Sequence, residues 1–151
     1  MLDNSREDLK QTLIILILKK SILEKISELL SKPSGINRND IFAKLYEREK
    51  LGSTSIGKGV AIPHARIHNI EYPFLSIMIL DEPVDFDNID SLDVDIIASL
   101  IVPEENFSNH LELLAYLSNK LDDPFIRKEL RQARNSSQII KNLRSDDLEF
   151  I

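Results

Sequence analysis

Two apolar, β-rich runs near the middle of the chain constrain its fold more than any other feature. One covers residues 74–80 and the other residues 94–102, and Pro73, Pro83 and Pro103 bound them. A strand with one solvated face alternates apolar and polar residues, whereas near-continuous apolarity is typical of strands covered on both faces. The two runs are therefore predicted to form the centre of a sheet with a further layer on each side.

Apolar residues at helical spacing lie on both sides of these runs. Residues 22–30 form one helical face, which Ser21 can cap and Pro33 can end. The branched run just before it, residues 13–18, is consistent either with the first turns of the same helix or with a short buried strand. Helices at the ends and strands in the middle predict one α/β domain built in layers.

Further helices are marked by residues that favour helix ends. One is expected to start at Asn37 or Asn39 and to end near Leu51, with Gly52 as a left-handed cap. Three more starts follow the second apolar run, each with a capping residue: Asn109 in a capping-box-like string with Glu112, Asp123 before Pro124, and Ser136 or Ser137.

The composition is that of one globular domain and excludes several other classes. With 151 residues, of which 42% are apolar, the chain can bury a core without disulfides. It has no cysteine, which excludes thiol catalysis and cysteine zinc sites. Its formal net charge of −6 has the wrong sign for a general nucleic-acid binder, so no nucleic-acid partner is expected.

The longest apolar run, residues 13–18, does not predict a membrane segment. It falls well short of the ~20 residues that a helix needs to cross a bilayer. A secretory signal is disfavoured as well, because acidic residues precede the run and Lys19 and Lys20 follow it. We therefore expect a cytoplasmic protein with no insertion into a membrane.

The basic residues are distributed unevenly along the chain. Residues 67–119 contain no lysine or arginine, against eleven acidic residues. A site that binds an anion must therefore take its cations from the two flanks of this stretch. In the second flank Arg127, Arg131 and Arg134 share one helical face, which we interpret as a solvated surface.

The chain has three histidines, His64, His68 and His110. His64 follows Pro63, which has no N–H and stops sheet pairing, so its imidazole is expected at a strand end where the chain turns away. This placement favours a functional role, and the alternative is a loop histidine bonded to a carbonyl. The spacing of His64 and His68 is that of two metal ligands on a helix, but Pro63 argues against a helix here.

A loop of small residues, 53–59, comes just before His64. Its backbone N–H groups could bind an oxyanion, and the hydroxyls of Ser53 and Thr54 are candidate phosphate-binding groups. The alternative is that these two residues serve turn formation and helix capping. The loop lacks the span of a nucleotide-binding P-loop, so nucleotide binding is not expected.

Four strings of residues form a pattern that extends over most of the chain: residues 47–54, residues 56–64 with Ala-Ile-Pro-His at their end, residues 82–86 and residues 102–114. Together they resemble the EIIA domain of the phosphoenolpyruvate:sugar phosphotransferase system, of the fructose/mannitol type. Within that type the resemblance is to the nitrogen-regulatory EIIA proteins. It covers residues 21–151 as a single domain, whereas residues 1–20 match poorly.

The resemblance implies a mixed β-sheet with helices on both faces, in three layers. It also implies a phosphocarrier in which His64, the histidine after Ala-Ile-Pro, accepts a phosphoryl group from an HPr-like phosphocarrier protein. The second active-site histidine of the family matches His110, and its active-site arginine matches Arg48. No cofactor is implied, because a phosphohistidine donor leaves no nucleotide to hold. Ala65 and Ser55 stand where the family usually has glycine.

Three functions compete at this point. The first is a phosphocarrier with a regulatory purpose of the nitrogen type, which would act on target proteins. The alternative is the EIIA component of a fructose/mannitol-type sugar uptake system. A distant alternative is a metal hydrolase that uses His64, His68 and His110.

Overall fold

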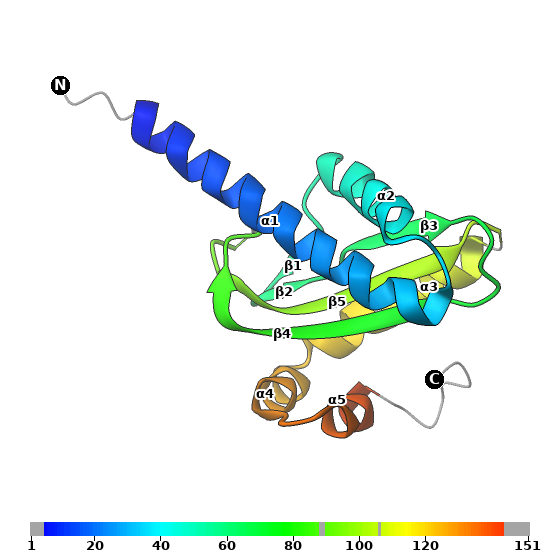
Figure 1. The fold of residues 1–151 in the computed structure, drawn as a ribbon. Coiled ribbons are helices and arrows are strands. Elements are labelled where there is room, and N and C mark those ends of the chain that lie inside the picture. The colour runs from blue at the N-terminus through cyan, green and yellow to red at the C-terminus, as the bar shows by residue number, and fades with distance from the viewer. Residues whose placement is uncertain (1–4, 88–89, 106, 144–151) are drawn as a thin grey trace.

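A computed structural model describes residues 5–87, 90–105 and 107–143 of the chain, and Figure 1 shows its fold. The elements follow one another in this order: α1 (Ser5–Ser34), α2 (Arg38–Lys50), β1 (Ser55–Gly57), β2 (Val60–Ala61), β3 (His64–Ile67), β4 (Phe74–Val84), β5 (Val94–Pro103), α3 (Phe107–Asp122), α4 (Pro124–Gln132) and α5 (Ser136–Leu143).

Strand β5 is the centre of the sheet, as its apolar run predicts. It pairs antiparallel with β4 on one side and parallel with β2 and β3 on the other, and β1 pairs antiparallel with β2. The prediction that the first apolar run is also central is wrong, because β4 pairs with β5 alone among the described strands. Its side chains are half-buried, since α1 lies against it, and Pro83 is tolerated because an edge strand has a free side.

Strands β2 and β3 are two parts of one extended segment that pairs with β5. Ala61 lies opposite Ile97 and His64 lies opposite Leu100, so the register is unchanged across Ile62 and Pro63. Only the proline, which cannot donate to the ladder, separates the two parts.

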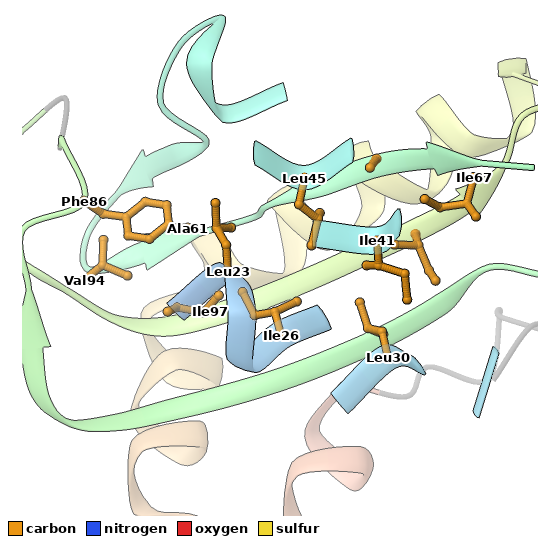
Figure 2. Packing of buried hydrophobic residues seen from close by; sticks show 12 residues of the cluster. Leu23, Ile26, Leu30, Ile41, Leu45, Ala61, Ile67, Phe86, Val94 and Ile97 are labelled. Carbon is orange, nitrogen blue, oxygen red and sulfur yellow. The ribbon is translucent and has the colours of Figure 1, made fainter. Parts of the chain in front are cut away.

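Two cores fill the spaces on the two faces of the sheet, which confirms the predicted three layers. On one face α1 and α2 cover the sheet, and Figure 2 shows Leu23 and Ile26 of α1 beside Ile97 of β5. On the other face Leu117 and Leu121 of α3 pack with residues of β5, and α4 and α5 complete that layer. Apolar surface is buried on both faces of the sheet, and each Å² removed from water stabilises the fold by about 25 cal/mol.

Helix α1 begins at Ser5, sixteen residues before the predicted cap at Ser21. Residues 13–18 are helical and all but Ile15 are exposed, so the buried-strand alternative is wrong. The physical reason is the absence of glycine and proline between Ser5 and Pro33, since nothing in that interval stops a helix once it has started. Pro33 lies in the last turn, and Gly35, with φ of +73°, follows the end.

Other helix ends were predicted with mixed success. Asn37 and Asp123 cap α2 and α4 as expected, and each accepts a hydrogen bond from the backbone two residues on. Asn109 lies inside α3 instead of capping it, because the helix begins at Phe107. At α5 the side chain of Asn135, not a serine, accepts from the Gln138 N–H.

The end of α2 also differs in detail from the expectation. The helix ends at Lys50 with Leu51 as its C-cap, close to the predicted end, but Gly52 has φ of +153° and lies outside the left-handed helical region. Glycine is still the residue that reaches this value without strain. Among the described residues, none of the helices combines the length and the apolar character that a bilayer-spanning segment needs.

Candidate functional site

His64 is the first residue of β3, and the chain does not turn away there as predicted. The carbonyl of Pro63 still accepts a hydrogen bond of 2.9 Å from the Leu100 N–H, so the proline interrupts the ladder without ending it. Because side chains alternate along a strand and Ala65 belongs to the α1/α2 core, the His64 side chain leaves the sheet on the α3 side. It is half-buried.

The hydrogen bonding of His64 defines which ring nitrogen can react. Its Nδ1 lies 2.8 Å from the Ile62 carbonyl oxygen, an acceptor, so in the neutral ring Nδ1 carries the proton and donates it. None of the described residues bonds to Nε2, whose lone pair is then free. Burial lowers the pKa of His64 below its ordinary value, and the nearby Arg48 charge lowers it further, against the opposing effects of the Ile62 bond and Glu49. The imidazole is therefore held neutral at neutral pH.

Arg48 comes to the site from the last turn of α2. It lines a cavity of about 470 Å³ together with His64 and His110, and a second one of about 350 Å³ next to it also has Arg48 and His64 in its wall. Its Nη1 donates to the Gly52 carbonyl at 3.0 Å, which fixes the guanidinium beside the loop and leaves other N–H groups for a ligand. The cations of the larger cavity, Lys44, Arg48 and Arg66, all precede the lysine- and arginine-free stretch, as expected.

His110 reaches the same cavity from the first turn of α3. Its Nε2 lies 2.9 Å from the Glu105 carbonyl oxygen, so this nitrogen donates and Nδ1 remains free as an acceptor. The structure thus brings together three of the sequence-predicted site residues although α2, β3 and α3 are far apart in the chain. Leu111 and Leu114 of α3 add an apolar wall to both cavities.

The two hydroxyl candidates lie at the base of the loop and are engaged inside the protein. Ser53 Oγ donates to the Phe86 carbonyl at 2.7 Å, and Thr54 Oγ1 donates to Glu49 Oε2 at 2.7 Å. The Thr54 N–H also donates to Glu49, at 3.1 Å. Both residues line the smaller cavity, but their hydroxyl protons hold the loop in place.

Sequence reasoning missed a buried ion pair beneath this loop. Lys19 Nζ of α1 lies 3.0 Å from Glu49 Oε1 of α2, and the two side chains are only 12% and 6% exposed. The ammonium also lies 4.8 Å from the centre of the Phe86 ring, at cation–π distance. A signal was present, because Glu49 extends the buried stripe of Ile41 and Leu45 by one more turn.

A path of hydrogen bonds leads from this ion pair to the reactive histidine. Glu49 accepts from Thr54, the Thr54 carbonyl accepts from the Ile62 N–H at 3.0 Å, and the Ile62 carbonyl accepts from His64 Nδ1. Every backbone group on this path has a defined partner. The orientation and the tautomer of His64 therefore rest on Glu49 through two intermediate residues.

The three histidines do not come together as a metal site. His68 is largely exposed and contacts Glu104, away from the hydrogen bonds of His64. Across residues 5–87, 90–105 and 107–143, no three histidine, cysteine, aspartate or glutamate side chains are grouped as metal ligands. The metal-hydrolase alternative therefore has no geometric support.

The geometry of this cavity defines a class of protein. A mixed α/β domain presents a neutral imidazole nitrogen, a guanidinium and an apolar wall at one cavity, an arrangement suited to the transfer of a small anionic group. The sequence matches the family described as "Phosphoenolpyruvate-dependent sugar phosphotransferase system, EIIA 2" over residues 9–146. The chain belongs to this family, and the match begins within the first twenty residues, which the resemblance had left out.

Similar proteins agree with this assignment. A nitrogen regulatory protein of Pseudomonas aeruginosa is 42% identical over 116 residues, which cover 76% of this chain and 75% of that protein. The crystal structure of nitrogen regulatory protein IIA-Ntr from Neisseria meningitidis superposes with a TM-score of 0.80 at 36% identity, covering 83% of this chain and 86% of the other.

A more distant structure shows the same fold. It is enzyme IIA mannitol of Escherichia coli in its complex with phosphorylated enzyme IIB mannitol, with a TM-score of 0.68 at 18% identity over 83% of this chain and 86% of the other. At this identity the likeness establishes the fold alone. The chain is thus an EIIA domain that is similar in sequence to nitrogen regulatory proteins and shares its fold with enzyme IIA mannitol.

Proposed function

We propose that this chain is a phosphocarrier and that His64 Nε2 is the atom that accepts the phosphoryl group. The observation that carries the proposal is the bond from His64 Nδ1 to the Ile62 carbonyl, since it leaves Nε2 unprotonated. Burial lowers the pKa of the same imidazole, which keeps it in the nucleophilic form. Membership of the EIIA 2 family supports a phosphotransfer role.

The proposed step moves one phosphoryl group between two imidazoles. The lone pair of His64 Nε2 attacks the phosphorus of a donor phosphohistidine and forms a P–N bond, while the P–N bond of the donor breaks and its electron pair returns to the donor ring. The proton on His64 Nδ1 stays in place, because the Ile62 carbonyl holds it before and after transfer. The protein contributes position and charge, as is usual for phosphoryl transfer.

The neighbouring residues have separate proposed roles. Arg48 stabilises the charge on the phosphoryl oxygens through its free N–H groups. His110, on the α3 side, either turns its Nε2 proton from the Glu105 carbonyl to these oxygens or orients His64. Ser53 and Thr54 are proposed to contribute to phosphate binding mainly by shaping the loop, because a direct hydroxyl contact needs their present hydrogen bonds to break.

The proposed donor is an HPr-like phosphocarrier protein, and the proposed purpose is regulatory. The support for the purpose is the 42% identity to a nitrogen regulatory protein, against lower identity to sugar-specific components. The second candidate is the EIIA step of fructose/mannitol-type sugar uptake, which the fold shared with enzyme IIA mannitol keeps open.

Labelling with phosphoenolpyruvate, the general transfer enzyme and an HPr-like protein tests the acceptor. An acid-labile phosphate is expected on the wild-type chain, absent in His64→Ala and retained in His68→Ala, which removes an exposed histidine as the matched control. Arg48→Ala and His110→Ala are expected to be slower by about 10²–10³ while still labelled at His64. Label that survives His64→Ala would overturn the assignment.

A second assay separates the two purposes. The phosphorylated chain is mixed with purified EIIB domains of fructose and mannitol type, and loss of label to EIIB is followed. Retention of the label supports the regulatory purpose, whereas rapid transfer to either EIIB domain supports sugar uptake.

A further inference from the structure

The first half of α1 extends beyond the rest of the domain and exposes apolar side chains on most of its circumference. Figure 1 shows its first turns projecting away from the sheet and from α2. The large apolar residues that are exposed there are Leu9, Leu13, Ile14, Leu16, Ile17 and Leu18, with between 39% and 65% of their surface accessible. A helical segment that is apolar nearly all round is normally covered by a partner.

One face of α1, opposite the side that packs on the sheet, has an ordered arrangement of charge. We call it the outer stripe, and it consists of exposed residues at heptad-like spacing: Arg6, Lys10, Leu13, Ile17, Ser21, Glu24 and Glu28. Its first two residues are basic, its last two are acidic, and the uncharged residues Leu13, Ile17 and Ser21 lie between them. Both the spacing and the reversal of charge are symmetric about Ile17.

This symmetry makes the outer stripe complementary to itself when two copies run antiparallel. Arg6 then lies opposite Glu28 of the other copy, Lys10 opposite Glu24, and Ile17 opposite Ile17 at the two-fold axis. A parallel arrangement would instead place each charge against its own kind. This complementarity of charge favours a second copy of this chain as the occupant, since antiparallel pairing gives all four charged residues of the stripe an opposite charge.

The neighbourhood of the acidic end leaves space for the basic end of a partner helix. A groove of about 460 Å³ lies between α1 and the start of α2, and Glu24 and Glu28 are in its wall. Lys25 and Arg38 line it as well, and Lys25 lies 3.6 Å from Glu28 in an exposed pair that water screens. Incoming Arg6 and Lys10 side chains would compete with Lys25 for Glu28, and they would meet the charge of Arg38 in the same wall.

We propose that the chain forms a two-fold symmetric dimer in which the outer stripes of two α1 helices pair antiparallel about Ile17. The paired segment from Arg6 to Glu28 is about 33 Å long at 1.5 Å per residue. The helix carries Lys19 on its inner side, next to Glu49, so the dimer would form on the same helix that supports the loop before His64.

Sedimentation velocity over a range of protein concentrations tests the association. A concentration-dependent dimer is expected, and Ile17→Glu, which places two carboxylates together at the axis, is expected to weaken it by about a hundredfold or more. The matched control is Ile140→Glu, the same change at an exposed isoleucine of α5, which is expected to leave dimerisation unchanged. Far-UV circular dichroism establishes that each variant is folded.

Charge exchange tests the register. Lys10→Glu and Glu24→Lys are each expected to weaken the dimer by about tenfold, because symmetry turns each change into two repulsive contacts. The double variant restores both pairs with reversed sign and is expected to dimerise within about threefold of the wild type.

The absence of cysteine in the chain allows a test of direction. Ile17→Cys is expected to form a disulfide-linked dimer under mild oxidation, because the two positions meet at the axis. Lys10→Cys is expected not to, since antiparallel pairing separates the two positions by about 21 Å along the helix.

Several results would overturn the proposal. One is a wild-type chain that stays monomeric at high concentration, for example because its own ends cover the stripe, and another is a dimer that Ile17→Glu does not weaken. A double charge variant that dimerises no more strongly than the single variants would also contradict it. Equal cross-linking of both cysteine variants would indicate parallel helices.

Discussion

Two polar clusters hold the two ends of the hairpin formed by β1 and β2, and they differ in burial. The inner cluster consists of Lys19, Glu49 and Thr54, at the entry to β1, and its ion pair is almost inaccessible to water. The outer cluster lies at the turn between the strands and joins four residues that are mostly exposed: Lys58, Asp95, Asp122 and Arg131. Only the inner cluster is linked by hydrogen bonds to His64.

The outer cluster corrects the interpretation of the three arginines as a solvated face. Arg131 binds Asp95 with two parallel hydrogen bonds of 2.8 and 2.9 Å and donates to the Lys58 carbonyl at 3.0 Å. Arg127 donates to the last carbonyls of α3, and Arg134 lies beyond the end of α4. The arginines of α4 therefore attach that helix to its neighbours.

Burial, more than bond length, decides how much each of these ion pairs contributes to stability. Lys58 Nζ lies only 2.6 Å from Asp122 Oδ1, but the side chains are 53% and 67% exposed and water replaces the contact when it breaks. Breaking the longer Lys19–Glu49 pair leaves a charge with no solvent to compensate it.

Removal of the inner carboxylate is expected to have the largest effect on stability. Glu49→Ala leaves the Lys19 ammonium and the Thr54 N–H without their acceptor in a buried place. A loss of about 3–5 kcal/mol in the free energy of unfolding is expected, measured by urea denaturation. Asp95→Ala in the outer cluster is the control, and an equal loss there would contradict the role given to burial.

The turn of the outer cluster is expected to show the next largest effect. Gly59 has φ of +80°, and a Cβ built there would lie 2.7 Å from Arg131 Nη2 and 3.0 Å from Asp95 Oδ1. Gly59→Ala is expected to lower the free energy of unfolding by about 1–2 kcal/mol because of the backbone conformation, and displacing Arg131 adds to this loss. Gly35→Ala is the control, because Gly35 has φ of +73° with no atom within 4 Å of its Cβ position. Equal losses of stability in the two variants would show that Arg131 and Asp95 can move aside without destabilising the protein.

The two clusters also show how far the sequence predicts this molecule. Chain patterns correctly indicate β5, the caps of α2 and α4 and the two-sided sheet, because each follows from local spacing or capping chemistry. The inner cluster was missed, although Lys19 continues the stripe of Leu23, Ile26 and Leu30 as Glu49 continues that of α2. Two opposite charges on two buried stripes indicate a buried pair, but their contact depends on how the helices cross.

The outer ion pair of Arg131 is expected to contribute less than either change above. Arg131→Ala removes a bidentate pair whose arginine is 37% exposed, and a loss of no more than about 1 kcal/mol is expected. Because the pair is accessible to ions, the loss should shrink in 1 M salt, where the screening length is about 3 Å. Lys19→Ala is expected to retain its loss at the same salt, and urea denaturation of both variants at two salt concentrations compares them.

The smallest expected effect is electrostatic and reaches the reactive histidine. Burial lowers the pKa of His64, and the charge of Glu49 opposes this by raising it. Glu49→Gln keeps the shape of the side chain and an acceptor for the Thr54 N–H while removing the charge, so the pKa of His64 is expected to fall further. Asp95→Asn, the corresponding change in the outer cluster, is expected to leave it unchanged.

A titration of the imidazole Cε1–H signals by NMR measures these shifts, with His64→Gln used to assign the resonance. The same lowered pKa links His64 to stability. As pH falls through 6.5, the ordinary value, the unfolded chain takes up a proton at this residue before the folded one does, so the free energy of unfolding falls. His64→Gln is expected to lose that part of the acid sensitivity. If Asp95→Asn shifted the pKa of His64 as much as Glu49→Gln does, the charge of the inner cluster would act on His64 no more strongly than that of the outer cluster. The two clusters would then differ in their contribution to stability alone.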